Sequence, residues 1–170
     1  MYQDAVLIAL GSNLSGGFDS SKALLEAAVA RLTAVGLRVV KRSSWWRSAA
    51  WPDPTAPDYL NGLAIVETGL GPAQTMAALT EIEGEFGRER GERNAARTLD
   101  LDLIAYGRTV LEGPDLILPH PRAPERLFVM GPLAEIAPEW THPVQGKTAR
   151  ALAAGAQVGR DAAATCGLSD

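Results

Sequence analysis

One stretch of the sequence limits the possible folds more than any other: residues 98–107, which read TLDLDLIAYG. Successive side chains of a β-strand point to opposite faces, so the leucines are expected to face a core while Asp100 and Asp102 share the other face. Burial of the leucines would hold the register of this strand. The pattern therefore predicts a strand that presents two carboxylates side by side.

The elements before this strand follow a simple order. Residues 5–10 are apolar throughout, as in a central strand covered on both faces, and residues 20–35 carry apolar side chains at helical spacing. Residues 37–48 and 59–68 are predicted to be extended, and a second helix is expected to begin near Pro72. The order predicts an α+β fold of the ferredoxin-like, split βαβ kind with a mostly antiparallel sheet. A Rossmann-like fold is the alternative, and it would need more regular alternation of strands and helices.

The rest of the chain offers weaker signals. After Gly113 we predict only short elements and a helix near residues 147–154. The length of 170 residues suits one domain, which we expect to cover residues 1–158. Residues 159–170 are predicted to form a flexible C-terminal tail.

Composition excludes several classes of function. The formal net charge of -4 argues against a general nucleic-acid binder, which is normally basic. The single cysteine, Cys166, excludes a disulfide framework and a multi-cysteine metal site. The sequence starts without a signal-peptide pattern, and no apolar run approaches the roughly 20 residues that cross a bilayer. We expect a cytoplasmic protein that binds neither nucleic acid nor membranes.

The two aspartates predict a cation site. Each carboxylate raises the cost of ionising the other, and Mg²⁺ compensates such a pair because it takes one or two carboxylates together with water and phosphate oxygens. Four arginines come just before the pair: Arg88, Arg90, Arg93 and Arg97. Guanidinium groups bind phosphate oxygens in pairs, so this window favours a phosphate site. The alternatives are two solvated aspartates on an amphipathic strand, and a surface loop whose charge Glu89 and Glu92 offset.

Five short blocks of the sequence are similar to motifs of one known enzyme family. The block RTLDLD at residues 97–102 resembles the signature of the 6-hydroxymethyl-7,8-dihydropterin pyrophosphokinases. Other blocks similar to that family are GSNL at 11–14, DYLN at 58–61, IE…GR at 82–88 and PHPR…R-x-F at 119–128. They occur in the family's order across about residues 5–140, so chance does not account for them.

This resemblance implies a three-layer α/β/α sandwich with a cleft for ATP, two Mg²⁺ ions and 6-hydroxymethyl-7,8-dihydropterin. It implies an ATP-dependent pterin pyrophosphokinase of folate biosynthesis. The hydroxymethyl oxygen of the pterin would attack the β-phosphorus of ATP in line, giving AMP and the pterin pyrophosphate. We expect a monomer whose partners are these small molecules.

Roles carry over position by position. The implied metal ligands are Asp100 and Asp102, and the implied catalytic set adds Arg88 and Arg97. The positions implied to bind ATP are Glu83, Arg88, Arg97, His120 and Arg126. The positions implied to bind the pterin are Asn13, Ser48, Tyr59, Asn61 and Phe128.

Each of these side chains also has an ordinary structural interpretation. Asn61 could satisfy backbone groups at a turn, Tyr59 and Phe128 could pack in a core, and His120 could be structural. Glu83 borders an apolar helix stripe, and a buried carboxylate there needs an arginine or ligand partner.

The sequence also departs from the family pattern. Some relatives carry a tryptophan just ahead of the RTLDLD block, and residues 93–97 here contain no aromatic side chain. Any contact that this tryptophan would make is therefore expected to be absent or to be supplied by Trp51, in a proline-rich segment. Two other functions stay open at this point: a Mg²⁺-dependent phosphohydrolase, and a sensor that binds nucleotide or pterin without catalysis.

Overall fold

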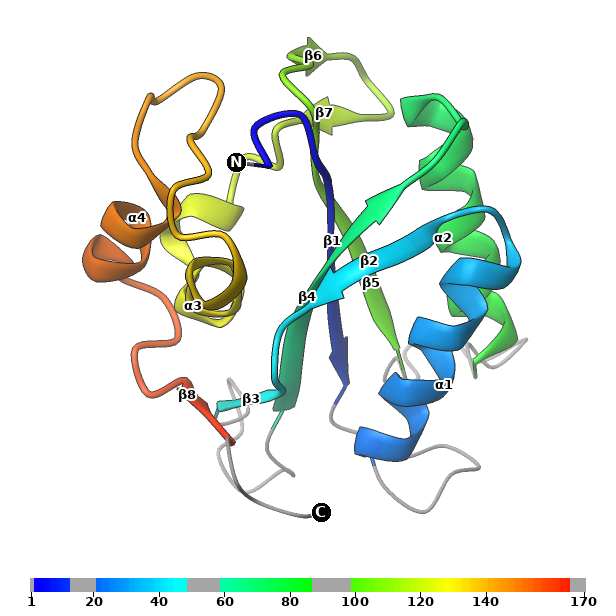
Figure 1. The fold of residues 1–170 in the computed structure, drawn as a ribbon, viewed down its shortest axis with the longest axis horizontal. Coiled ribbons are helices and arrows are strands. Elements are labelled where there is room, and N and C mark those ends of the chain that lie inside the picture. Colours follow the sequence, from blue (N-terminus) through cyan, green and yellow to red (C-terminus); the bar gives the residue numbers. More distant parts are fainter. Residues whose placement is uncertain (1, 13–20, 49–58, 87–98, 166–170) are drawn as a thin grey trace.

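The computed structural model describes residues 2–12, 21–48, 59–86 and 99–165 (Figure 1). Its strands and helices, in chain order, are β1 (Val6–Ser12), α1 (Ser21–Ala34), β2 (Arg38–Arg42), β3 (Trp46–Ser48), β4 (Tyr59–Glu67), α2 (Pro72–Glu85), β5 (Asp100–Tyr106), β6 (Leu111–Glu112), β7 (Ile117–Leu118), the 3₁₀ turn η1 (Ala123–Glu125), α3 (Leu127–Ile136), α4 (Ala149–Gly155) and β8 (Ala163–Ala164). No helix within these ranges is long and apolar enough to cross a membrane.

The main sheet has the strand order β5-β1-β4-β3-β8, and β2 also pairs with β4. Each pairing among these strands is antiparallel. The first and last strands of the predicted βαββαβ order, β1 and β5, are neighbours, as the ferredoxin-like plan requires. The predicted α+β fold is confirmed, and the antiparallel pairings argue against the Rossmann-like alternative.

Two hydrophobic cores lie on opposite faces of this sheet. One core packs Ile8 and Leu10 of β1 against α1 and α2, and the other packs Leu7 and Ala9 against α3 and α4. Figure 1 shows the resulting three layers, with the sheet between the two helix pairs. Because β1 is buried along its whole length, its segment needs apolar side chains on both faces.

Helix α3 was not predicted from the sequence. It contains Pro132, which lacks a backbone N–H and normally ends a helix. Its side chains Val129, Met130 and Leu133 are nevertheless almost fully buried against the sheet. The free energy of this packing outweighs the local preference against a helix.

Residues 159–165 of the predicted C-terminal tail lie within the described part of the chain, and residues 166–170 lie outside it. Ala163–Ala164 forms β8 and pairs with Trp46 and Arg47 of β3. The backbone N–H and the hydroxyl of Thr165 both donate to the carbonyl oxygen of Trp45, at 2.9 and 2.7 Å. Backbone pairing, which needs no hydrophobic pattern, therefore places this part of the chain on the sheet edge.

Candidate active site

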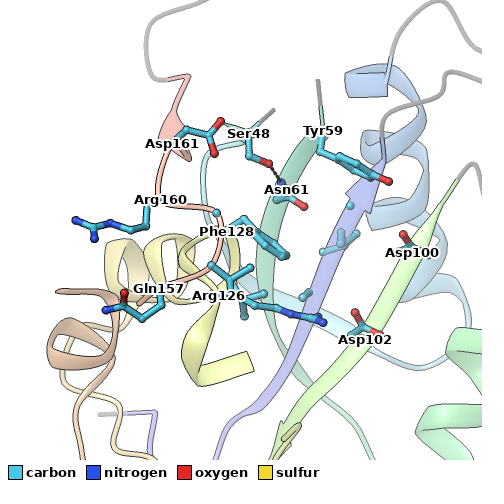
Figure 2. A pocket seen from close by; sticks show the side chains of 16 residues that line it. Ser48, Tyr59, Asn61, Asp100, Asp102, Arg126, Phe128, Gln157, Arg160 and Asp161 are labelled. Carbon is cyan, nitrogen blue, oxygen red and sulfur yellow. Dashed lines mark hydrogen bonds between the residues drawn. The ribbon is translucent and has the colours of Figure 1, made fainter. Parts of the chain in front are cut away.

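A pocket of about 780 Å³ opens on the face of the sheet that α3 covers, next to the first turn of that helix. Its walls come from β1, β3, β4 and β5, from Arg126 and Phe128 at the start of α3, and from residues 157–161. Figure 2 shows the side chains that line it. The pocket thus joins segments that lie far apart in the sequence.

Strand β5 supplies the acidic wall. Leu99, Leu101 and Leu103 are each at most 2% exposed, in the core next to α1 and α2. Asp100 and Asp102 therefore project from the opposite face, and both line the pocket. The predicted alternation is confirmed, so the two carboxylates are neighbours at one end of the sheet.

The two carboxylates also fit the expected metal. Among the described residues, no group of three or more His, Cys, Asp or Glu side chains forms a cluster that could hold an ion. Mg²⁺ does not need such a cluster, because one or two carboxylates suffice when substrate phosphates and water complete its octahedron. The pocket in front of Asp100 and Asp102 leaves room for those phosphates.

Glu83 lies behind this wall rather than in the pocket lining. Its side chain on α2 is buried, and its Oε2 accepts a hydrogen bond from the backbone N–H of Leu101 at 2.8 Å. Leu101 stands between the two aspartates on β5, the outer strand of the sheet. The carboxylate of Glu83 thereby provides a hydrogen-bond acceptor for the backbone N–H of Leu101 at the edge of the sheet.

The facing wall is polar and is built on β3 and β4. The amide Nδ2 of Asn61 donates to the Oγ of Ser48 at 3.2 Å, and both side chains are buried. Gly11 is the partner of Asn61 on β1, and a Cβ at Gly11 would come within 2.8 Å of the Asn61 Oδ1. The absence of a side chain at Gly11 therefore allows Asn61 to lie where it does.

Aromatic and cationic side chains complete the pocket. Phe128 and Tyr59 both line it, and the guanidinium of Arg126 lies 5.7 Å from the centroid of the Phe128 ring. In Figure 2 the guanidinium end of Arg126 points toward Asp102. A flat aromatic ligand and a charged group could therefore be accommodated at neighbouring positions.

His120 lies near the acidic wall without lining the pocket. Its backbone N–H donates to the carbonyl oxygen of Ile104 on β5 at 2.8 Å, and its Nδ1 accepts from the backbone N–H of Arg122 at 3.2 Å. Burial lowers the pKa of His120, Asp102 opposes that shift, and Arg126 and Arg122 add to it. The neutral ring, protonated at Nε2, is therefore favoured as a hydrogen-bond donor.

The structure brings together most of the predicted site residues. Those that line the pocket are Ser48, Tyr59, Asn61, Asp100, Asp102, Arg126 and Phe128. Glu83 and His120 lie next to β5 instead. Asn13, Arg88, Arg97 and Trp51 lie outside the described residues.

Sequence reasoning missed the part of the wall formed by residues 157–161. No motif marks this segment, and the small and polar residues around it were interpreted as a tail. The backbone pairing of Val158 with Arg126 holds this segment beside the start of α3, and that pairing is visible only in three dimensions.

Comparison with known proteins shows the family of this chain. The family model described as 7,8-dihydro-6-hydroxymethylpterin-pyrophosphokinase (HPPK) matches residues 7–138. The chain belongs to this family. The matched range contains both carboxylates, the Ser48–Asn61 pair and Phe128, and it ends before residues 157–161.

Individual HPPK relatives are similar over most of the chain. A 2-amino-4-hydroxy-6-hydroxymethyldihydropteridine pyrophosphokinase from Synechocystis is 45% identical over 143 residues, which cover 84% of this chain and 71% of that protein. The protein of the same description from Haemophilus influenzae is 39% identical over 136 residues, or 80% of this chain and 83% of that one.

A solved HPPK-DHPS structure from Plasmodium falciparum, crystallised with pteroate, has the same fold. Its TM-score is 0.71 at 11% sequence identity, and the match covers 88% of this chain. The chain spans only 44% of that longer chain, so the likeness concerns the fold of the HPPK part alone.

Proposed function

We propose that the pocket is the active site of an HPPK enzyme, in which ATP and 6-hydroxymethyl-7,8-dihydropterin bind side by side. The chain is an ATP-dependent pyrophosphokinase of folate biosynthesis, which transfers pyrophosphate from ATP to the hydroxymethyl group of the pterin. One observation carries the assignment of the pocket. The paired carboxylates of β5 line the same cavity as the buried amide of Asn61 and the ring of Phe128.

The pterin would occupy the end of the pocket near Asn61 and Phe128. An amide offers both donors and an acceptor, and a pterin edge carries both kinds of group. Because Ser48 accepts one N–H of Asn61, the other N–H and the Oδ1 are oriented before the ligand arrives. Phe128 would stack on the flat heterocycle, with Tyr59 as the second aromatic side chain.

The phosphates of ATP would lie over β5. Asp100 and Asp102 are the residues that would hold two Mg²⁺ ions, and these ions, when bound, neutralise the charge that develops on the phosphates. Arg126 would bind phosphate oxygens from the pocket side, and His120 would donate from Nε2. Arg88 and Arg97 have proposed roles in the same place that rest on the family resemblance.

These residues would act by positioning rather than by covalent chemistry. They would hold the hydroxymethyl oxygen in line with the β-phosphorus and exclude water from the phosphates. No side chain lining the described part of the pocket is needed as a general base in this scheme. We also keep as proposals from the sequence that the enzyme is monomeric and cytoplasmic.

An assay of the products tests this proposal. The protein is incubated with ATP, Mg²⁺ and 6-hydroxymethyl-7,8-dihydropterin, and the expected products are AMP and the pterin pyrophosphate in equal amounts. A phosphohydrolase would release phosphate without the pterin, and a sensor would bind both ligands without forming AMP. Either result would refute the proposed reaction.

A further inference from the structure

The segment formed by residues 157–161 is attached to the rest of the site by its backbone. The N–H of Leu127, at the start of α3, donates to the carbonyl oxygen of Val158 at 2.8 Å. The N–H of Val158 in turn donates to the carbonyl oxygen of Glu125, also at 2.8 Å. The segment therefore runs beside the residues that carry Arg126 and Phe128 into the pocket.

Gly159 is the point of closest approach. A Cβ built on Gly159 would lie 2.6 Å from Cδ2 and 3.1 Å from Cε2 of the Phe128 ring. The φ angle of Gly159 is +72°, which L residues rarely adopt. A glycine is thus required here both by the backbone and by the contact with the ring.

The same segment forms one side of the pocket. Val158, Gly159 and Asp161 line it, and Figure 2 shows this part of the chain next to Phe128. The side chain of Arg160 extends away from the pocket in that view. Directly beside Phe128 the wall is formed by Gly159, which has no side chain to come between the segment and the ring.

We propose that residues 157–161 are part of the pterin-binding site and that Gly159 is a positioning residue, which sets the place of the Phe128 ring. This inference rests on the proposed function, because it assumes that a flat heterocycle stacks on Phe128. It extends the binding site beyond residue 138, where the match to the family ends. A bulkier residue at position 159 would push the ring into the space that the pterin needs.

Two glycines with the same backbone angle provide a matched test. Gly146 also has a φ of +72°, but a Cβ there would meet nothing within 4 Å. Gly159→Ala and Gly146→Ala therefore share the backbone strain and differ in the contact with Phe128. Thermal unfolding should show a decrease in Tm for both variants, and a larger decrease for Gly159→Ala, because there the Phe128 ring must also shift.

Binding of each substrate is then measured separately by calorimetry, with 6-hydroxymethyl-7,8-dihydropterin and with a non-hydrolysable ATP analogue. Gly159→Ala should weaken pterin binding about tenfold and leave nucleotide binding within about twofold. Gly146→Ala should leave both unchanged. In a Phe128→Leu background, Gly159→Ala should have little further effect on the pterin, because the two residues act through one contact.

Val158→Ala covers the case in which Gly159→Ala does not fold. Val158 is 46% exposed, so the protein should tolerate this change, and the loss of part of the wall should weaken pterin binding about threefold. Unchanged pterin binding in Val158→Ala would then overturn the inference.

The failures of the two proposals are distinguishable. This inference would be overturned if pterin binding weakened equally in Gly159→Ala and Gly146→Ala. It would also be overturned if Gly159→Ala lost pterin binding and nucleotide binding to the same extent. In both cases the proposed function would stand. A parent protein that does not bind the pterin would overturn the proposed function and this inference with it.

Discussion

Asp102 lies opposite Ala9 on β1, and Asp100 lies opposite Gly11, so both carboxylates face small partners across the strand pair. Small partners leave space in front of the carboxylates, and the leucines on the other face hold the strand in register. The proposed metal binding by Asp100 and Asp102 therefore depends on the small side chains of their partners on β1.

The first prediction concerns Asp102. Asp102→Asn keeps the size of the side chain but removes a charge that the bound cations need. We expect kcat/KM to fall by at least about a hundredfold, or roughly 3 kcal/mol, with the fold unchanged. AMP formation at saturating Mg²⁺ measures the effect, and Asp115→Asn, at an exposed position, is the control. Parent-like turnover in the Asp102 variant would refute the metal assignment.

A second prediction at this scale concerns Asn61. Asn61→Ala removes the amide that we assign to the edge of the pterin, and it leaves Ser48 without the hydrogen bond it now accepts. Loss of such buried polar contacts costs about 1–3 kcal/mol, so pterin binding should weaken by roughly tenfold to a hundredfold. ATP binding should change little. Comparable losses for both ligands in calorimetry would count against the assigned role.

At the scale of elements, α2 and β5 are joined by Glu83, whose carboxylate binds the Leu101 N–H between the two aspartates. Two residues further along the same helix, Glu85 forms an exposed ion pair with Arg31 of α1, at 2.7 Å. The two glutamates thus have different surroundings: one supports the strand that carries the site, and the other links two helices at the surface.

The third prediction follows from that difference. Glu83→Ala leaves a buried backbone donor without its carboxylate, which should destabilise the fold by about 1–3 kcal/mol. It should also lower kcat, because β5 loses a support between Asp100 and Asp102. Glu81→Ala, at an exposed position of the same helix, is the control and should change neither quantity. Urea unfolding and AMP formation are the measurements, and a Glu83 variant that behaves like the control would disprove the supporting role.

At the scale of the whole molecule, residues 44–46 connect both helical layers to the sheet. The indole Nε1 of Trp45 donates to Glu26 of α1, and that of Trp46 donates to Glu135 of α3, each at 2.8 Å. The two rings pack over Gly62 and Gly131, where a Cβ would come within 2.5 Å of each ring. The adjacent side chains of Trp45 and Trp46 are thus directed to opposite faces of the sheet.

The fourth prediction is the pH dependence of stability. Burial by itself would raise the pKa of Glu135, but hydrogen bonds from Trp46 and Ser44 outweigh it and lower the pKa below the ordinary value of 4.5. A carboxylate whose pKa is lower in the folded state stabilises that state fully at a pH above the ordinary pKa. Its contribution disappears as the pH falls through the folded-state pKa. The free energy of unfolding should therefore decrease on acidification below about pH 4.5.

Glu135→Gln separates this effect from general acid denaturation. The variant should be less stable than the parent at pH 7, and the difference should shrink as the pH approaches 3. Glu112→Gln, at an exposed position on β6, serves as the control. Urea titrations across this pH range measure the differences, and a gap between the parent and Glu135→Gln that stays constant with pH would contradict the assignment.

The sequence predicted the elements whose side chains follow a helical period or form a continuous apolar run. The helices near 20–35 and 147–154 and the strands near 5–10 and 59–68 agree closely with α1, α4, β1 and β4. Helix α3 and strand β8 were not predicted, since Pro132 opposes the first and a short, alanine-rich segment carries no pattern for the second. Both depend on contacts with parts of the chain far away in sequence.

By itself the sequence determined the antiparallel α+β plan, the membership in the family and the face of β5 that carries the two aspartates. Local periodicity decides the face of β5, because a buried face requires apolar residues at fixed intervals whatever the rest of the chain does. The plan follows from the order of the predicted elements, and the membership in the family follows from the resemblance of the five sequence blocks. Only the tertiary structure decided that Glu83 binds the backbone behind Asp100 and Asp102, and that residues 157–161 lie against Phe128. Such contacts join distant segments and involve backbone groups, which do not depend on the type of side chain. No pattern of side chains in the sequence therefore predicts them.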